Sequence, residues 1–320
     1  MTDSVRSSGS HLEVLTMGRV GVDLYPEQVR VSLEDVTTFR KFLGGSPTNV
    51  AVAAARHGRS AAVITRTGAD PFGEYIHRAL RGFGVDDRFV GTDRALRTPI
   101  VFCELLPPES PTILFYRQPS APDIQIAAGE LDLGAVRDAR IFWTTGTGLS
   151  ADPSRAATIA ALEARDGADG ITIHDLDHRP MFWSDESEAG VWAREALRHA
   201  TVAVGNRDEV EVAVGTRDPL AASAALLDLG VEIAIVKQGP DGVLARTADG
   251  VVEVPPVRLE VVNGLGAGDA FGGSLVHALL AGWDVERAVR LANAAGAYVA
   301  SQLACADAMP TMEQLMGVTA

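Results

Sequence analysis

One stretch of the sequence combines glycines that can surround an anion with a single carboxylate. Residues 263–273 read Asn-Gly-Leu-Gly-Ala-Gly-Asp-Ala-Phe-Gly-Gly, and an apolar segment typical of a helix follows at 274–283. Because glycine has no Cβ, Gly266 and Gly268 allow the backbone close to a bound group, and a helix start adds unpaired N–H groups. A loop that only holds phosphate would normally avoid a fixed negative charge. Asp269 therefore indicates a chemical role.

Three interpretations of Asp269 compete. A lone Asp before a helix most often caps the N-terminus of that helix. A dinucleotide-binding fingerprint would need glycine at position 269, and a P-loop would need Gly-Lys-Ser/Thr, which neither Lys41 nor Lys237 provides. The third interpretation is an anion hole that carries its own base, an arrangement suited to phosphoryl transfer onto a hydroxyl group.

The motif Gly266-Ala267-Gly268-Asp269 resembles the Gly-Ala-Gly-Asp signature of the ribokinase-like (PfkB) family of carbohydrate kinases. The resemblance implies that Asp269 is the catalytic base, that the amides of residues 266–268 form the anion hole, and that ATP and Mg²⁺ take part. Asn263 stands near the place of an acidic residue that the family usually has beside a monovalent cation. This difference predicts absolute dependence on Mg²⁺ and weak activation by K⁺.

Two further motifs resemble the sugar-binding elements of the family. Gly44-Gly45-x-x-x-Asn49 is similar to its first signature, where glycine amides and the Asn meet the sugar, and Asp23 matches its acceptor of sugar hydroxyls. The plainer interpretation of a Gly-Gly pair before a helix is a turn, and the same holds for an Asp at the end of a strand.

Two arginines lie in stretches that resemble the acid-sugar members of the family. Arg117 belongs to residues 115–121, Phe-Tyr-Arg-Gln-Pro-Ser-Ala, and Arg179 belongs to residues 175–183. The resemblance implies that Arg117 meets the acidic end of the substrate and that Arg179 shares the task. The alternative for Arg117 is a solvated arginine at the end of a strand.

Three stretches resemble the elements of the family that bind ATP and Mg²⁺: residues 206–209, 237–242 and 292–297. The resemblance assigns ATP contacts to Asn206, Lys237, Gly239, Gly242 and Asn293, and a water-mediated contact with Mg²⁺ to Glu209. Each stretch also has a plainer interpretation, which is a helix cap, a hairpin turn and close helix packing respectively.

The substrate prediction depends on residues 115–117, 175–183 and 261–271, which look most like the kinases of 5-dehydro-2-deoxygluconate in inositol breakdown. The alternatives are 2-keto-3-deoxygluconate or a neutral sugar of the fructokinase or ribokinase type. A nucleotide-sensing protein without turnover is a different class of function, and the presence of Asp269 argues against it.

The neighbouring residues His174 and His178, together with Asp175 and Asp177, allow another interpretation, as metal ligands. The two histidines straddle the end of a predicted strand, so their spacing does not imply one face of a helix. Asp177 replaces an Asn of the family pattern, and its role stays open.

The composition argues against several classes of function. The formal net charge of −14 argues against nucleic acid and anionic membranes as partners, because both require a basic surface. Cys103 and Cys305 are far apart in the sequence, which argues against a disulfide or zinc framework. Residues 1–12 are expected to be a disordered leader without the apolar core of a signal peptide. No apolar run is long enough for a membrane span, and a cytoplasmic protein is expected.

The order of predicted elements determines the fold class. Strands and helices alternate, which predicts an α/β domain with a mostly parallel central sheet. The resemblance implies that this is a three-layer α/β/α ribokinase-like domain over residues 13–320. A first strand is expected at 14–24, ending at Asp23, and Ser46 is expected to cap the next helix. Two β-rich runs without a helix between them predict antiparallel pairing, so that strands from about 25–43 and 98–118 form a small β-sheet lid. Exposed lid strands could pair two copies into a homodimer.

Overall fold

The structure is a computed structural model that describes residues 12–28, 30–106 and 112–319. The expected leader lies outside these residues except for Leu12, which packs partly buried against the core. Within the described part of the chain, no helix is both long enough and apolar enough to cross a membrane.

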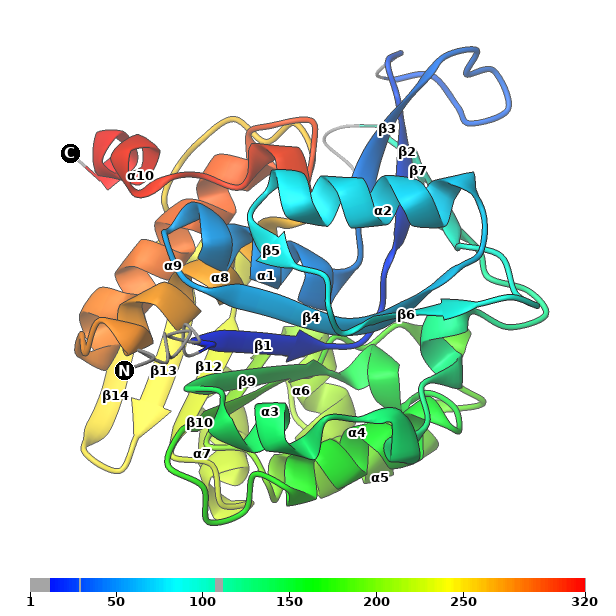
Figure 1. Cartoon of the computed structure of the whole chain (residues 1–320). Coiled ribbons are helices and arrows are strands. Elements are labelled where there is room, and N and C mark those ends of the chain that lie inside the picture. The colour runs from blue at the N-terminus through cyan, green and yellow to red at the C-terminus, as the bar shows by residue number, and fades with distance from the viewer. Residues whose placement is uncertain (1–11, 29, 107–111, 320) are drawn as a thin grey trace, which may run out of the picture.

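A ten-stranded sheet forms the centre of the molecule (Figure 1). Its order is β14 (Gly250–Val254), β13 (Val243–Thr247), β12 (Ile233–Lys237), β11 (Val202–Asn206), β10 (Ile171–Asp175), β9 (Ile141–Thr145), β1 (Val14–Met17), β4 (Ala61–Gly68) and β5 (Val85–Asp86), with β6 (Val90–Asp93) also on β4. In this spatial order, each strand between β12 and β5 is parallel to its neighbours, whereas β13 and β14 form an antiparallel edge beside β12. The mostly parallel α/β sheet that the sequence predicts is confirmed.

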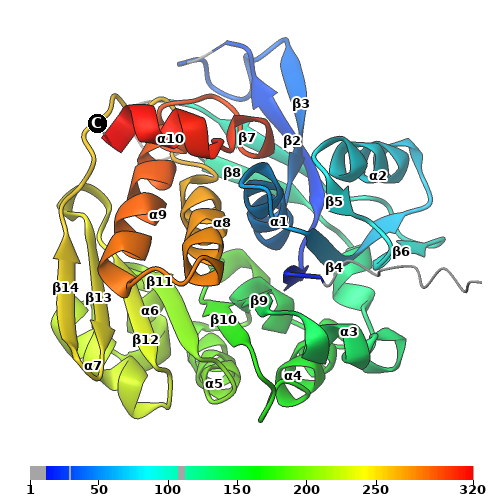
Figure 2. The same ribbon diagram turned by 60° about the vertical axis from the view of Figure 1, so that its left-hand side comes forward.

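Helices cover both faces of this sheet, as Figures 1 and 2 show. One face carries α1 (Ser46–Arg56), α2 (Pro71–Gly82), α8 (Ala267–Leu280) and α9 (Val285–Ala300), with α10 (Met312–Thr319) beside α9. The other face carries α3 (Leu133–Asp138), α4 (Ser154–Glu163), α5 (Glu186–Leu197), α6 (Arg207–Val214) and α7 (Pro219–Asp228).

Alternation along the central strands explains why both faces are covered. Val14 packs with the α1 and α8 side of the core, whereas the next residue, Leu15, packs with the α4 side. Trp143 and Phe142 divide in the same way, and all four side chains are fully buried. A strand that is apolar at every position must be covered on both sides, which is the pattern of a parallel sheet in an α/β protein.

A second sheet of four strands stands above the carboxyl ends of the central strands (Figure 1). Its order is β3 (Phe39–Gly44), β2 (Gly21–Pro26), β7 (Ile100–Glu104) and β8 (Thr112–Tyr116). β7 and β8 are antiparallel, as their sequences predict. Leu114 and Tyr116 on β8 are among the exposed large apolar side chains of the described residues. Pairing of two lids in a homodimer stays a prediction.

The expected single strand at 14–24 is wrong, because the chain changes sheets in the middle of that segment. β1 ends at Met17 in the central sheet, and β2 begins at Gly21 in the lid. Gly18, with φ of 140°, permits the bend between them, since residues with a Cβ rarely adopt this conformation. Asp23 therefore lies on a lid strand, opposite Phe42 of β3.

Two glycines bring α8 unusually close to α1. A Cβ on Gly272 would lie 2.6 Å from the Trp143 ring, and a Cβ on Gly273 would overlap Ala53 of α1. Larger side chains here would separate the two helices. The close approach matters because α1 and α8 each begin at the site described next.

Candidate active site

The polar residues of the site follow the carboxyl ends of parallel strands, where open α/β sheets bind their ligands. Arg19 follows β1, and residues 177–179 follow β10. Asn206 and Lys237 are the last residues of β11 and β12. Sheet geometry alone thus gathers residues that are far apart in the sequence.

Asp269 is the third residue of α8, which begins earlier than the sequence predicts. Gly266 occupies the N-cap position with φ of 80°, so the interpretation of Asp269 as the cap of its helix is wrong. The Oδ2 atom of Asp269 instead accepts a hydrogen bond of 2.7 Å from Nδ2 of Asn49, on the first turn of α1. The two helix starts are therefore joined through the carboxylate.

The environment of Asp269 favours the protonated carboxyl group. Burial raises its pKa, hydrogen bonds from Asn49 and Ser46 and the charge of Arg19 lower it, and the nearby charge of Asp177 raises it. The net pKa lies above the usual value for Asp. A raised pKa makes this carboxylate a stronger base than a solvated one once it is ionised.

The first turn of α1 differs from its prediction. Gly45, with φ of 107°, is the N-cap residue, and Ser46 is already inside the helix without capping it. A Cβ on Gly45 would meet the carbonyl oxygen of Arg19, so the turn requires glycine. A Cβ on Gly44 would likewise overlap the carboxylate of Asp23. Both glycines therefore allow close contact between the start of α1 and the β1–β2 segment.

A cavity lies between the lid and the start of α8, and we call it the sugar-side cavity. Of the residues predicted for the site, Asp23, Gly45, Asn49, Arg179, Gly266 and Asp269 line it. Arg19, Tyr25 and both cysteines line it as well, and sequence reasoning missed them as site residues. The Oη atom of Tyr25 and the Sγ atom of Cys305 share a hydrogen bond of 2.6 Å. Neither cysteine is in a disulfide.

Asp23 has an unusual titration within this cavity. Burial raises its pKa to about 6, while the charge of Arg19 and a hydrogen bond from Tyr25 oppose the increase. Near neutral pH the carboxylate form prevails and can accept hydrogen bonds from sugar hydroxyls. This placement is compatible with the predicted contact of Asp23 with the substrate.

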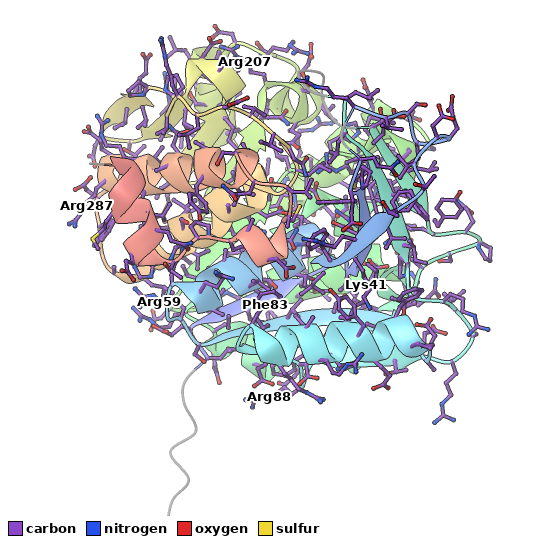
Figure 3. The ribbon with its side chains drawn as sticks, turned by 90° about the horizontal axis from the view of Figure 1, so that it is seen from above. Lys41, Arg59, Phe83, Arg88, Arg207 and Arg287 are labelled. Carbon is purple, nitrogen blue, oxygen red and sulfur yellow. The ribbon has the colours of Figure 1, made fainter. Side chains whose placement is uncertain are left out.

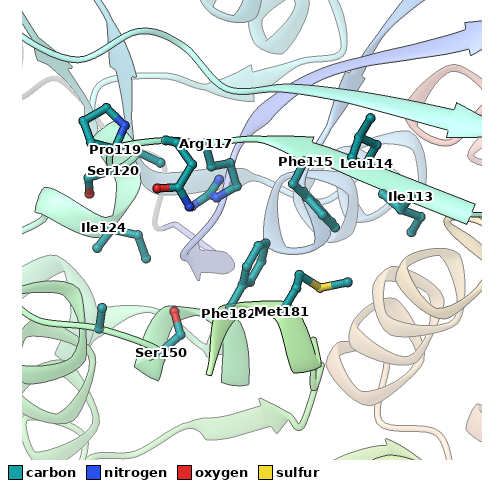
Figure 4. A pocket seen from close by; sticks show the side chains of 13 residues that line it. Ile113, Leu114, Phe115, Arg117, Pro119, Ser120, Ile124, Ser150, Met181 and Phe182 are labelled. Atoms are coloured by element: carbon teal, nitrogen blue, oxygen red, sulfur yellow. The ribbon is translucent and has the colours of Figure 1, made fainter. Parts of the chain in front are cut away.

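Arg117 lines a neighbouring cavity of about 380 Å³. Its Nη2 donates to Oδ1 of Asp123 at 2.8 Å, and its Cζ lies 5.2 Å from the centroid of the Phe182 ring. Figure 4 shows Arg117 and Phe115 on the lid side of this cavity, opposite Phe182. The Phe115 side chain also lines the sugar-side cavity. Contact of Arg117 with the substrate stays a prediction.

A larger cavity of about 670 Å³ lies on the other side of the anion loop, and we call it the nucleotide cavity. Four of the predicted ATP-binding residues line it, together with two residues of the anion loop: Lys237, Gly239, Gly242, Asn293, Ala267 and Gly268. The Asn293 side chain donates to the carbonyl oxygen of Pro255 at 2.9 Å. The start of α8 therefore separates the two cavities.

Lys237 is the cation that stands next to the anion loop. A Cβ on Gly268 would lie 3.3 Å from its Nζ, which is also 3.8 Å from Asp175 Oδ1 and 4.0 Å from Glu209 Oε2. Burial lowers the pKa of Lys237, but the charges of these carboxylates outweigh burial and raise it. Lys237 is therefore charged. The other lysine, Lys41, lies over the ring of Tyr75 beside α2 (Figure 3).

Asn206 and Glu209 form a capping box at the start of α6. The Asn206 side chain accepts from the amide of Glu209 at 2.9 Å, and Glu209 Oε2 accepts from the amide of Asn206 at 2.7 Å. The plainer interpretation of this motif is therefore confirmed. The predicted contacts with ATP and Mg²⁺ are compatible with this cap, because each side chain has a second polar atom, and they stay predictions.

The segment after β10 holds Arg179 in place. Asp177 is buried, its Oδ1 pairs with Nη2 of Arg179 at 3.0 Å, and its Oδ2 accepts from the hydroxyl of Thr147. His174 is fully buried, and its Nδ1 lies 2.9 Å from the hydroxyl of Thr144. Among the described residues, no group of three His, Cys, Asp or Glu side chains could hold a metal ion. Asp177, whose role the sequence left open, is therefore an ion-pair partner of Arg179 in the structure.

The buried carboxylate of Asp269 and the amides at the start of α8 lie between a larger and a smaller cavity, an arrangement suited to a phosphotransferase that acts on a hydroxyl group. The family model described as "pfkB family carbohydrate kinase" matches residues 12–312. The chain belongs to this family, and it is an ATP-dependent sugar kinase.

Relatives and solved structures support this assignment over nearly the whole chain. A 5-dehydro-2-deoxygluconokinase of Geobacillus thermodenitrificans is 31% identical over 310 residues, 95% of this chain and 92% of the relative. A Vibrio cholerae fructokinase double mutant with fructose, ADP and potassium superimposes with a TM-score of 0.85 at 26% identity, covering 96% and 98% of the two chains. Aminoimidazole riboside kinase of Salmonella enterica superimposes with a TM-score of 0.81 at 26% sequence identity, and the match covers 96% of this chain and 99% of that kinase.

We predict that Asp269→Asn lowers kcat by about 10²–10⁴-fold, because the change removes the base and leaves the amides of the anion loop in place. ATP affinity, measured by calorimetry, should remain close to that of the wild type. The matched control is Asp249→Asn, an exposed acid in the turn between β13 and β14, which should not change kcat. Near-normal turnover in a folded Asp269→Asn protein would refute the role of the base.

The raised pKa of Asp269 leads to a prediction about pH. The protonated carboxyl group cannot accept a proton, so kcat should fall as the pH drops through this raised pKa. The Asn49 hydrogen bond stabilises the ionised form, so Asn49→Ala should move the acidic limb of the kcat profile to higher pH. Asn293→Ala, the control in the nucleotide cavity, should leave the limb in place. An unchanged limb in Asn49→Ala would contradict this account.

Proposed function

We propose that the protein phosphorylates a sugar acid and that this acid is 5-dehydro-2-deoxy-D-gluconate. The observation that carries the proposal is the presence of two guanidinium groups, Arg19 and Arg179, in the sugar-side cavity beside Asp269. Guanidinium groups match the planar geometry of a carboxylate, and a neutral sugar offers them no charge. The relative from Geobacillus thermodenitrificans, named for this substrate, supports the same choice.

In the proposed reaction, Asp269 accepts the proton of the attacking sugar hydroxyl while the hydroxyl oxygen forms a bond to the γ-phosphorus of ATP. The bond between that phosphorus and the bridging oxygen breaks, and ADP leaves with the electron pair. The amides at the start of α8 and the charged Lys237 face the transferred group and stabilise its charge. Asp23 accepts hydrogen bonds from other hydroxyl groups and orients the sugar.

The residues near Lys237 fit a Mg²⁺ ion that arrives with ATP. Asp175 and Glu209 are buried carboxylates within 4.0 Å of Nζ of Lys237. Burial and the charges of neighbouring carboxylates raise the pKa of Asp175, so an added cation would relieve their repulsion. Mg²⁺ prefers oxygen ligands, and it usually binds one or two carboxylates together with substrate phosphates. When bound, the ion would neutralise phosphate charge.

The substrate proposal predicts a rank order of sugars. The kcat/KM for 5-dehydro-2-deoxygluconate should exceed that for fructose or ribose by about tenfold or more, the difference that one charged hydrogen bond supplies. ATP consumption across acids and neutral sugars measures it. A higher value for 2-keto-3-deoxygluconate would favour the related acid kinase, and a neutral hexose that equals the acids would contradict the proposal. Absence of turnover with every sugar would favour the nucleotide-sensing alternative.

The cation requirement gives a separate prediction. The side-chain amide of Asn263 donates a hydrogen bond to the carbonyl oxygen of Leu303, and its side-chain oxygen accepts one from the backbone amide of Leu265. Asn263 brings no charge to the loop. A K⁺ ion near this loop would lack the acidic neighbour that we expect strong activation to need. Chelation of Mg²⁺ should abolish turnover, whereas replacement of Na⁺ by K⁺ should raise kcat only weakly. A large increase specific to K⁺ would refute this prediction.

A further inference from the structure

Arg19 is a buried cation without a partner group among the residues that the structure describes. Its side chain lines the sugar-side cavity with Asp23, Asn49 and Asp269, and the residue is 9% exposed. Its Nε is buried without a hydrogen-bond partner. Its guanidinium lies over the Phe115 ring, whose centroid is 5.3 Å from Cζ. Burying a charged group without partners is costly, so such a group indicates a missing ligand.

Arg117 and Arg179, the two arginines that the sequence predicts to meet the substrate, already have carboxylate partners. Arg117 pairs with Asp123 at 2.8 Å, and Arg179 pairs with Asp177 at 3.0 Å. Each of these arginines also has one buried nitrogen without a hydrogen-bond partner, so the ion pair is what distinguishes them from Arg19. Arg19 acts on Asp23 and Asp269 only through its field, since it lowers the pKa of both without an ion pair to either. The hydrogen-bonding fork of Arg19 is therefore available to a ligand that enters the cavity.

The position of Arg19 suits recognition of one end of a short substrate. Asp269 receives the reacting hydroxyl, and Asp23 offers an acceptor for a second hydroxyl in the same cavity. Arg19 adds donors without an acceptor, which a carboxylate matches with two parallel hydrogen bonds. A neutral sugar leaves this guanidinium buried and without a partner, which lowers its affinity relative to an acid.

We propose that Arg19 binds the carboxylate of the sugar acid and sets the preference of the enzyme for acids over neutral sugars. This role rests on the proposed function, because it requires an acidic substrate. It assigns specificity to a residue between β1 and β2, in the segment where the chain passes from the central sheet to the lid.

Arg19→Met keeps an unbranched apolar stem and removes the charged fork. It should lower kcat/KM for 5-dehydro-2-deoxygluconate by about 10- to 100-fold, mainly through KM, and change the value for fructose by less than about threefold. Arg19→Lys should recover only part of the loss, since an ammonium cannot form the two parallel bonds. Arg287→Met, at an exposed arginine on α9, is the matched control and should leave both values unchanged.

A structural role for Arg19 would give a different result. If Arg19 only offsets the charges of Asp23 and Asp269, Arg19→Met should impair the acid and fructose equally, and that outcome overturns the proposal. Thermal unfolding of each variant verifies that it folds. If Arg19→Met does not fold, Arg19→Lys carries the comparison, and equal losses with both sugars again overturn the role.

Direct binding separates this inference from the proposed function. Calorimetry with 5-dehydro-2-deoxygluconate in the absence of ATP should show weaker binding to Arg19→Met than to the wild type, and equal affinity overturns the role of Arg19. A wild-type enzyme that prefers fructose refutes the proposed substrate instead. A wild-type enzyme that prefers the acid, together with a variant that keeps this preference, refutes only the role of Arg19.

Discussion

The hydrogen bond from Asn49 to Asp269 is the interaction on which the site depends. It joins two residues 220 positions apart, one on the first turn of α1 and one on the first turn of α8. The bond forms only if the two helices approach closely, and Gly272 and Gly273 allow that approach by leaving room for Trp143 and α1. Catalytic geometry therefore depends on packing in the core beneath the site.

The distribution of charge around this bond explains how an acidic protein binds an anionic nucleotide. The net charge of −14 repels ATP at long range, so attraction must arise locally. The start of α8 supplies amides and the positive end of a dipole, and Lys237 stays charged because neighbouring carboxylates raise its pKa. Burial raises the pKa of Asp23 and Asp269 in the adjoining cavity.

The passage of the chain between its two sheets links specificity to the fold. The β1–β2 segment leaves the central sheet at Gly18 and enters the lid at Gly21, and it carries Arg19 into the sugar-side cavity. The same segment places Asp23 against the start of α1, where a Cβ at position 44 would overlap the Asp23 carboxylate. The lid therefore forms one wall of the sugar-side cavity and supplies side chains that line it.

The sequence by itself determined the features that local patterns encode: the alternation of strands and helices, the anion loop at 266–269, and the antiparallel pairing of β7 and β8. Tertiary structure decided the rest. The break at Gly18 lies within residues 14–24, a stretch with the composition of one strand, and the capping of α1 by Gly45 depends on close approach to the Arg19 carbonyl. The sequence feature that could have identified Arg19 as a site residue is its position shortly after the first strand, where a basic side chain reaches the carboxyl edge of the sheet. Its lack of a partner, like the pairing of Arg117 with Asp123, depends on distances between segments that only folding brings together.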